Sequence, residues 1–130
     1  IEYFLHQYAH DSGNSSYGLE AAEKLAVAPE RVFKTLVVKL DTAVLVVAIL
    51  PVNSMLSMKN VAKACGGRTG YVLGGVSPLG QKKSLKTVIE RSAQQYATIY
   101  VSGGRRGLEI ELNALDLQTL TQASFASISQ

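Results

Sequence analysis

The sequence has no tryptophan, one cysteine and three prolines among its 130 residues, and charged residues make up only 18% of it. A single cysteine excludes an internal disulfide and is typical of a reducing cytosol, so we expect a cytoplasmic protein. The apolar run at residues 44–50 is too short to span a membrane and ends at Pro51. We therefore expect no contact with a membrane.

Residues that bind metals or act as nucleophiles are scarce. The two histidines, His6 and His10, and the one cysteine, Cys65, do not have the spacing of a zinc site. A Cys–His nucleophile pair is conceivable, but Cys65 stands at the end of an expected helix, which favours a packed cysteine. We expect no metal and no other cofactor.

The composition that remains is that of a globular protein. With 47% apolar residues, a chain of this length is large enough to bury a core, so residues 1–130 are predicted to form a single domain. The formal net charge of +3 gives a mild preference for anionic partners such as RNA. The sequence begins at Ile1 and not at methionine, so we expect further residues to precede it.

Short β-branched runs alternate with a few helical patterns. Strands are predicted at residues 3–8, 32–40, 43–50, 71–73, 85–90, 98–102, 108–112 and 125–128, and helices at 19–26, at 57–65 and after Asn113, with a helical turn at 92–96. Residues 32–40 and 43–50 are separated by Asp41-Thr42 and predict a hairpin. Many short strands with glycine-rich turns favour an α+β fold with a curled, mostly antiparallel sheet.

Residues 69–83 read TGYVLGGVSPLGQKK and are the most distinctive stretch. The apolar run at 71–73 predicts a buried strand, because it is β-prone and bounded by glycine. Gly74 and Gly75 allow another group to approach the main chain closely. We interpret the stretch as a rigid loop that offers backbone N–H groups to a ligand. A tight corner of a β-barrel also explains these glycines.

Lys34 is the strongest candidate for chemistry. It lies in residues 32–40, which are apolar on both faces and therefore predict a central strand. A lysine at such a place either extends to the rim or occupies a pocket, where its ammonium needs an anionic or carbonyl partner. The sequence leaves both arrangements open.

Other charged residues are more easily explained as surface. Glu109 and Glu111 alternate with the apolar residues of 108–112, so both are expected to face solvent opposite the core. Two basic clusters are candidate phosphate contacts or ordinary solubilising charge: Lys82, Lys83 and Lys86, and Arg105 with Arg106.

Three motifs carry a resemblance: FKTLVV at 33–38, the stretch 69–83, and TIYVSGGRRGLEIEL at 98–112. Together they resemble the YbaK/EbsC family of aminoacyl-tRNA deacylases, from about Tyr3 to the C-terminus. The similarity is nearest to the branch that removes cysteine from Cys-tRNA(Pro). Related branches are the editing domain of prolyl-tRNA synthetase and the freestanding alanyl-tRNA editing proteins. The resemblance implies an α/β-barrel-like fold of mostly antiparallel strands with flanking helices.

The resemblance also implies a pocket for the aminoacylated 3′-terminal adenosine of tRNA. Lys34 matches the essential lysine of the family. The implied substrate-binding residues are Tyr8, Tyr17, Thr35, Gly74, Gly75, Ser102 and, less consistently among relatives, Glu109. The implied RNA contacts are Lys82, Lys83, Arg105 and Arg106.

The family implies no protein nucleophile. In its cysteinyl branch the thiol of the substrate attacks the ester carbonyl, while the Lys34 ammonium and the amides around Gly74 would stabilise the negative oxygen. The resemblance thus implies trans-editing of Cys-tRNA(Pro), with Cys-tRNA(Cys) as a further candidate, in a transient complex with prolyl-tRNA synthetase. The alternatives are an alanyl-tRNA(Pro) deacylase, a non-catalytic module that binds RNA or a synthetase, and a small-ligand-binding barrel.

The sequence departs from the family at two places. The family usually has a helix before Tyr3, which this sequence lacks. It also has a longer connection than Gly67-Arg68-Thr69. Because deletion of a segment beside the active site would disturb the pocket, we expect further residues at this connection.

Overall fold

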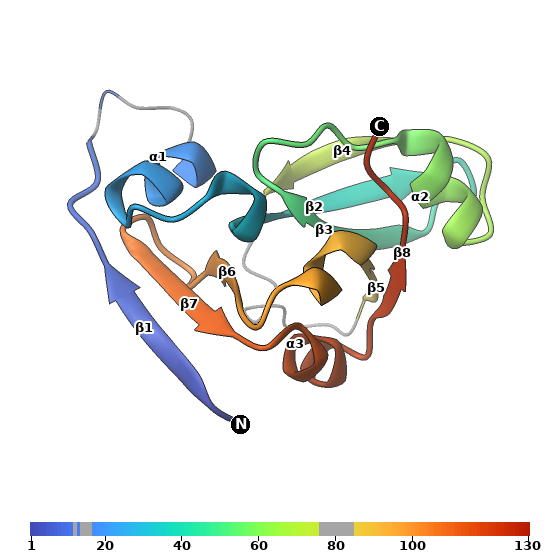
Figure 1. Ribbon diagram of the computed structural model, residues 1–130. Helices are drawn as coiled ribbons and strands as arrows, with labels where there is room; N and C mark the ends of the chain where they lie inside the picture. The colour runs from blue at the N-terminus through green and yellow to red at the C-terminus, as the bar shows by residue number, and fades with distance from the viewer. Residues whose placement is uncertain (12, 14–16, 76–84) are drawn as a thin grey trace.

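A computed structural model describes residues 1–11, 13, 17–75 and 85–130 (Figure 1). The strands are β1 (Tyr3–Gln7), β2 (Phe33–Leu40), β3 (Leu45–Pro51), β4 (Gly70–Gly75), β5 (Lys86–Glu90), β6 (Ile99–Ser102), β7 (Leu108–Leu112) and β8 (Ser124–Ala126). The helices are α1 (Tyr17–Lys24), α2 (Met58–Ala64), α3 (Ala114–Thr121) and the short 3₁₀ helices η1 (Pro29–Arg31) and η2 (Arg91–Gln95). None of these described helices is long and apolar enough to cross a membrane.

The described strands form two sheets, which confirms the predicted α+β class with mostly antiparallel pairing. The larger sheet has the order β4-β2-β3-β5-β8, in which β2 runs antiparallel to both neighbours and β5 runs parallel to β3 and β8. The smaller sheet, β1-β7-β6, is antiparallel throughout. A bridge between Val32 and Tyr100 joins the start of β2 to β6, so the two sheets meet there.

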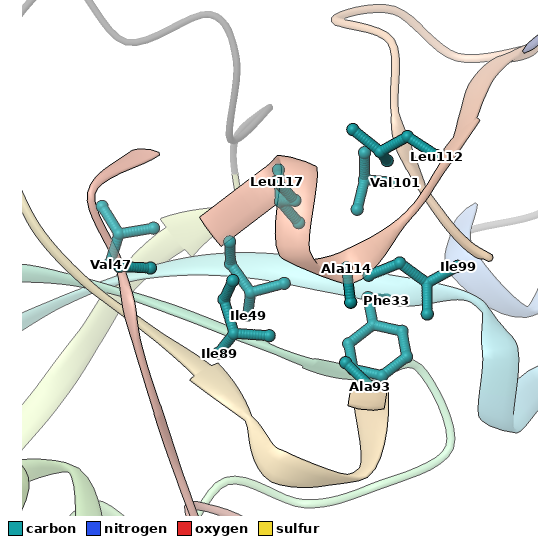
Figure 2. Close-up of a cluster of buried hydrophobic side chains, with 11 residues drawn as sticks. Phe33, Val47, Ile49, Ile89, Ala93, Ile99, Val101, Leu112, Ala114 and Leu117 are labelled. Carbon is teal, nitrogen blue, oxygen red and sulfur yellow. The ribbon is translucent and has the colours of Figure 1, made fainter. Parts of the chain in front are cut away.

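The core lies on both faces of β2 and β3, as the two-sided apolar pattern of residues 32–40 predicts. One face packs between the sheets and against α3 (Figure 2), through Phe33, Val47, Ile49, Ile89, Ile99, Val101, Leu112 and Leu117. The other face is covered by α2 and includes Val38, Leu40, Val46, Leu50, Val61 and Ala62. Burying one such aliphatic side chain contributes about 1.5–3 kcal/mol. The central hairpin is therefore the most strongly anchored part of the fold.

The helix ends follow local chemistry. Ser57 caps α2 by accepting a hydrogen bond from the Asn60 N–H at 3.2 Å, and Gly66 follows the helix with φ +84°. Asn113 caps α3 by accepting from the Leu115 N–H at 2.8 Å. Serine and asparagine are favoured at helix N-termini because their side chains satisfy free backbone N–H groups, and glycine is favoured just after the C-terminus.

Strand β4 corrects the prediction of a buried strand at residues 71–73. Tyr71, Val72 and Leu73 are 57%, 44% and 53% exposed. Among the described strands β4 pairs only with β2, so it forms an edge of the larger sheet. The remainder of the glycine-rich stretch, including Ser77, Pro78, Gly80, Lys82 and Lys83, lies outside the described residues.

The described chain runs without a break from α2 to β4, and a contact with Asp41 holds this short connection. The backbone N–H of Arg68 donates to Asp41 Oδ1 at 3.1 Å, and this bond is the main reason that the pKa of Asp41 is lowered. A Cβ at Gly67 would lie 2.8 Å from the same oxygen. Glycine at this position therefore permits the tight passage beside Asp41.

Candidate functional site

A pocket of about 860 Å³ lies between the start of α1, the first half of β2 and the hairpin of β6 and β7. The expected site residues that line it are Tyr17, Lys34, Thr35, Gly75, Ser102, Arg105, Arg106 and Glu109. Tyr8 and Gly74 do not line it, and Lys82 and Lys83 lie outside the described residues. Residues that are far apart in the sequence, such as Tyr17 and Glu109, thus line one cavity.

Lys34 lies in the pocket, which is one of the two arrangements that the sequence left open. Its Nζ donates to the backbone oxygen of Ser54 at 2.7 Å. Burial lowers the pKa of this half-buried amine, since desolvation disfavours the charged form. Among the described residues no carboxylate forms an ion pair with it. The ammonium therefore keeps donor capacity for an acceptor in the pocket.

Glu109 was expected to face solvent, and this prediction is wrong. Its exposure is 7%, and burial raises its pKa to about 7. It lies on β7 opposite His6 of β1 and Ser102 of β6. The face of the smaller sheet that carries it is covered by α1, whose Ala21 packs beside Tyr100. The cover comes from a distant segment, so the alternating pattern of β7 did not reveal it.

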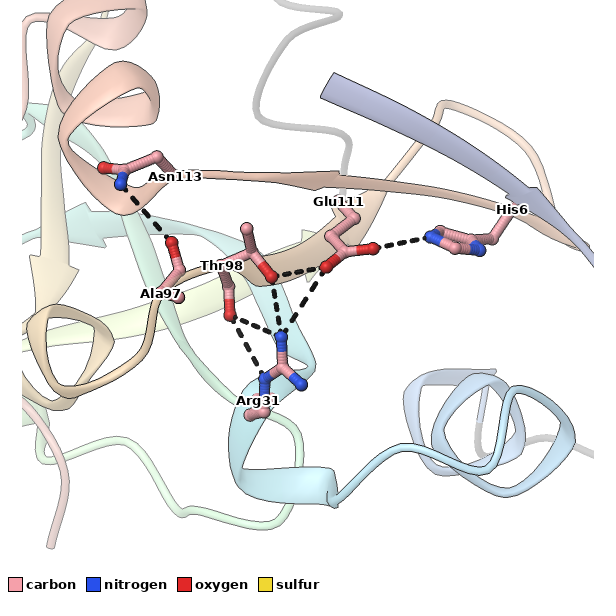
Figure 3. Close-up of polar contacts among 6 residues, drawn as sticks. All are labelled: His6, Arg31, Ala97, Thr98, Glu111 and Asn113. Carbon is pink, nitrogen blue, oxygen red and sulfur yellow. Dashed lines mark hydrogen bonds and ion pairs between the residues drawn. The ribbon is translucent and has the colours of Figure 1, made fainter. Parts of the chain in front are cut away.

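Glu111, two residues further along, is likewise not the solvated carboxylate that was expected. It accepts a hydrogen bond from the Thr98 hydroxyl and contacts His6 Nε2 at 2.8 Å (Figure 3). Arg31 Nη2 donates to Thr98 Oγ1 at 2.6 Å and lies 3.7 Å from Glu111 Oε2. Burial opposes ionisation of Glu111, but the hydrogen bonds hold its pKa below the usual value. This network joins η1 to the smaller sheet outside the pocket.

Tyr8 and Gly74, which were also expected at the site, do not line the pocket. Burial raises the pKa of Tyr8, and the charge of nearby Glu109 raises it further. The side chain packs against the buried cluster that contains Ala21 and Tyr100. A Cβ at Gly74 would meet no described atom within 4 Å. Packing among the described residues therefore does not explain why this position is glycine.

The wall beside α1 is built from stacked side chains. The Arg106 guanidinium lies 3.9 Å from the centre of the Tyr17 ring, a cation–π contact. Sequence reasoning missed Val52 on this wall. The sequence signal for this contact was the glycine at position 18, since a Cβ there would lie 2.3 Å from Val52 Cγ1. The lack of a side chain at Gly18 thus allows the start of α1 to pack directly against Val52.

Cys65 is a packed cysteine, as expected, and it does not line the pocket. Burial raises the pKa of its thiol, which leaves less of the nucleophilic thiolate. Among the described residues no group of three or more His, Cys, Asp or Glu side chains is arranged to hold a metal ion.

Comparison with known proteins identifies the fold and the family. The sequence profile of the aminoacyl-tRNA editing domain matches residues 15–120, which is most of the chain. The chain belongs to the aminoacyl-tRNA editing domain family. The resemblance inferred from the three motifs is therefore confirmed.

One relative in sequence and two solved structures with the same fold are similar to this chain. A protein of Enterococcus faecalis named as a candidate Cys-tRNA(Pro)/Cys-tRNA(Cys) deacylase, EbsC, is 40% identical over 121 residues, covering 83% of this chain and 74% of the relative. A crystal structure of a hypothetical protein, APE2540, superposes with a TM-score of 0.86 at 20% identity, covering 100% of this chain and 93% of that one. A candidate trans-editing enzyme for prolyl-tRNA synthetase superposes with a TM-score of 0.83 at 16% identity, covering 98% and 87%. The two structures share the fold.

Proposed function

We propose that this editing domain is an aminoacyl-tRNA deacylase that acts in trans and removes cysteine from Cys-tRNA(Pro), with Cys-tRNA(Cys) as a second substrate. The observation that carries the proposal is the Lys34 ammonium, half-buried in the pocket and bound only to a backbone carbonyl among the described residues. The 40% identity to a candidate deacylase of cysteinyl-tRNA gives the substrate class. The placement of this partly desolvated cation inside the pocket favours an enzyme over a non-catalytic module.

The charges of the pocket suit the two ends of an aminoacyl ester. Among the described residues that line the pocket, Glu109 is the only acidic one, and we place the α-ammonium of the amino acid on this side. Lys34 takes the ester carbonyl, while Arg105 and Arg106 at the hairpin tip face the phosphates of the terminal nucleotides. Thr35, Ser102 and the backbone at Gly75 complete the wall around the reacting group.

The nucleophile in this proposal is the thiol of the substrate. Its thiolate attacks the ester carbonyl, a C–S bond forms, and the carbonyl oxygen becomes an oxyanion that Lys34 stabilises. The C–O bond to the ribose then breaks, the ribose oxygen takes up a proton, and a cyclic thioester leaves. This is formally a lyase-type cleavage. Cys65 has no part in it, in agreement with its raised pKa and its packing away from the pocket.

A transient complex with prolyl-tRNA synthetase is the partner we propose. An editing enzyme that acts in trans must reach the mischarged tRNA before it leaves the synthetase. The structural similarity to a candidate trans-editing enzyme for prolyl-tRNA synthetase supports this partner.

The test is turnover with purified tRNA(Pro) carrying cysteine, serine or alanine. A thiol has a pKa of about 8.5, so a few per cent is ionised near neutrality, whereas a serine hydroxyl is far harder to ionise. We expect rapid deacylation of the cysteinyl ester, almost none of the seryl ester, and unchanged turnover in Cys65→Ala. Equal rates on all three esters would point to attack by water and to an alanyl-tRNA deacylase. Absence of turnover on every substrate would leave a binding module.

A further inference from the structure

A buried carboxylate outside the pocket is held by two hydrogen bonds and an ion pair. Glu20, in the first turn of α1, is 1% exposed. His10 Nδ1 lies 2.6 Å from its Oε1, and the Asp11 backbone N–H donates to its Oε2 at 2.9 Å. Lys24, one turn later, lies 3.8 Å from Oε2 and also donates to the backbone oxygen of Ala9. The hydrogen bond with His10 is the main cause of the lowered pKa of Glu20.

These contacts hold the chain that leads into the pocket wall. Glu20 binds two consecutive residues of the segment before α1, and Lys24 binds the residue before them. A charged group this deeply buried is costly unless it is fully hydrogen-bonded. The arrangement therefore fixes residues 9–11 against the helix, although neither Glu20 nor His10 lines the pocket.

His10 connects the carboxylate to the pocket. Its ring meets the Tyr17 ring edge-on, with 5.6 Å between the centroids. The Arg106 guanidinium in turn lies 3.9 Å from the centre of the Tyr17 ring, and both of these residues line the pocket. Glu20, His10, Tyr17 and Arg106 thus form one continuous line of contacts from a buried anchor to the cavity.

We propose that Glu20 and His10 are positioning residues, which hold the Tyr17 ring and the Arg106 guanidinium in place before the terminal nucleotide of tRNA binds. The inference rests on the proposed function. Tyr17 is 41% exposed and Arg106 is exposed, so without support both side chains would lose rotamer freedom on binding. Removing that freedom beforehand lowers the entropic cost of binding. It acts on affinity and leaves the chemical step unchanged.

The test is a double-mutant cycle between His10 and Arg106, read out by steady-state kinetics on Cys-tRNA(Pro). We expect His10→Ala to raise KM about tenfold, the combined cost of ordering two long side chains, with kcat within about twofold of wild type. His10→Asn keeps a nitrogen donor near Glu20 and is expected to recover part of that loss. In an Arg106→Ala background, we expect His10→Ala to raise KM only about threefold, because one of the two side chains that it positions is gone.

The opposite results overturn the inference. If His10→Ala leaves KM unchanged, or if its effect is additive with Arg106→Ala, the buried group stabilises α1 and does not position the wall. Should His10→Ala fail to fold, His10→Asn replaces it in the cycle, since it keeps the hydrogen bond and loses only the ring contact with Tyr17. It must then show a smaller rise in KM that shrinks further in the Arg106→Ala background.

A second readout separates this inference from the proposed function. Titration with AMP, followed by NMR, repeats the cycle without turnover. We expect His10→Ala to weaken AMP binding several-fold and to have a clearly smaller effect when Arg106 is alanine. If the wild-type protein binds AMP in this pattern but does not cleave Cys-tRNA(Pro), the proposed function fails and the positioning role stands. Equal AMP affinity in wild type and His10→Ala removes the positioning role whatever the turnover.

Discussion

Lys34 and Glu109 have opposite charges in one pocket, and burial moves both towards neutrality. It lowers the pKa of the amine and raises that of the carboxyl to about 7. Each group is therefore uncharged in a larger fraction of molecules than it would be on the surface. A partner that favours the charged form stabilises each of them most. A substrate with an electron-rich carbonyl at one end and an ammonium at the other provides both partners.

The first prediction concerns Lys34. Because its ammonium would stabilise the developing oxyanion, we expect Lys34→Ala to lower kcat on Cys-tRNA(Pro) by about 10²–10³ while the circular dichroism spectrum stays unchanged. Lys39→Ala is the matched control, since Lys39 lies on the same strand but does not line the pocket. Near wild-type turnover in Lys34→Ala would show that the lysine has no such role.

The second prediction concerns Glu109. Its folded pKa of about 7 lies above the ordinary value, so the folded state holds a proton that the unfolded chain releases. Stability then falls as the pH rises from about 4.5 to about 7, by at most about 3 kcal/mol. Glu109→Gln removes this penalty, and we expect its melting temperature to gain on that of the wild type as the pH is raised through this window.

Glu111 provides a control of opposite sign for that experiment. Its pKa is lowered, so its interactions stabilise the folded state above the ordinary carboxyl pKa and are lost as the pH falls. Glu111→Gln should be less stable than wild type near neutrality, with the difference shrinking in acid. Parallel pH profiles for the two glutamine variants would contradict the assigned environments.

At the scale of elements, the seating of α1 on the pocket wall depends on Gly18. We expect Gly18→Ala to destabilise the protein by about 1–3 kcal/mol, because the new methyl would lie 2.3 Å from Val52 Cγ1. The clash outweighs the gain of about 1 kcal/mol that alanine normally brings to a helix. Thermal unfolding of Gly18→Ala and of the double variant with Val52→Ala measures this, and the second substitution should restore stability.

Gly13→Ala is the control for that pair. Its new methyl would come no closer than 3.5 Å to any described atom, an ordinary contact. If Gly18→Ala is as well tolerated as Gly13→Ala, the helix is not seated as closely as the structure indicates.

The elements also show how far the sequence could be interpreted. The two-sided apolar pattern of β2 and the caps Ser57 and Asn113 depend on neighbours in sequence, so their positions were predictable. The exposure of β4 was not, because an apolar run does not reveal whether its strand is central or at an edge. The burial of Glu109 depends on α1, about ninety residues away in sequence, and the alternation of β7 contains no information about that contact.

For the whole molecule, the basic tip of the hairpin between β6 and β7 predicts a salt-dependent affinity for tRNA. If Arg105 and Arg106 each neutralise a phosphate, their joint replacement by alanine should flatten the slope of log K against log salt by about 1.4, at about 0.7 per phosphate. Lys59→Ala with Arg91→Ala is the matched control, because it removes the same charge from exposed residues that do not line the pocket. Equal slopes in the two double variants would mean that the hairpin arginines are ordinary surface charge.

The pairing of β1 with β7 has a consequence for the order in which the protein is made. Tyr3 of β1 lies opposite Leu112 of β7, so β1 cannot pair until residues 108–112 have been synthesised. Contacts between such distant segments carry a loop-closure cost and form slowly. The pocket has the same separation, since Lys34 emerges early in synthesis and Glu109 late. Until β7 has emerged from the ribosome, a nascent chain therefore has no complete pocket, and its apolar strand β1 remains open to chaperones.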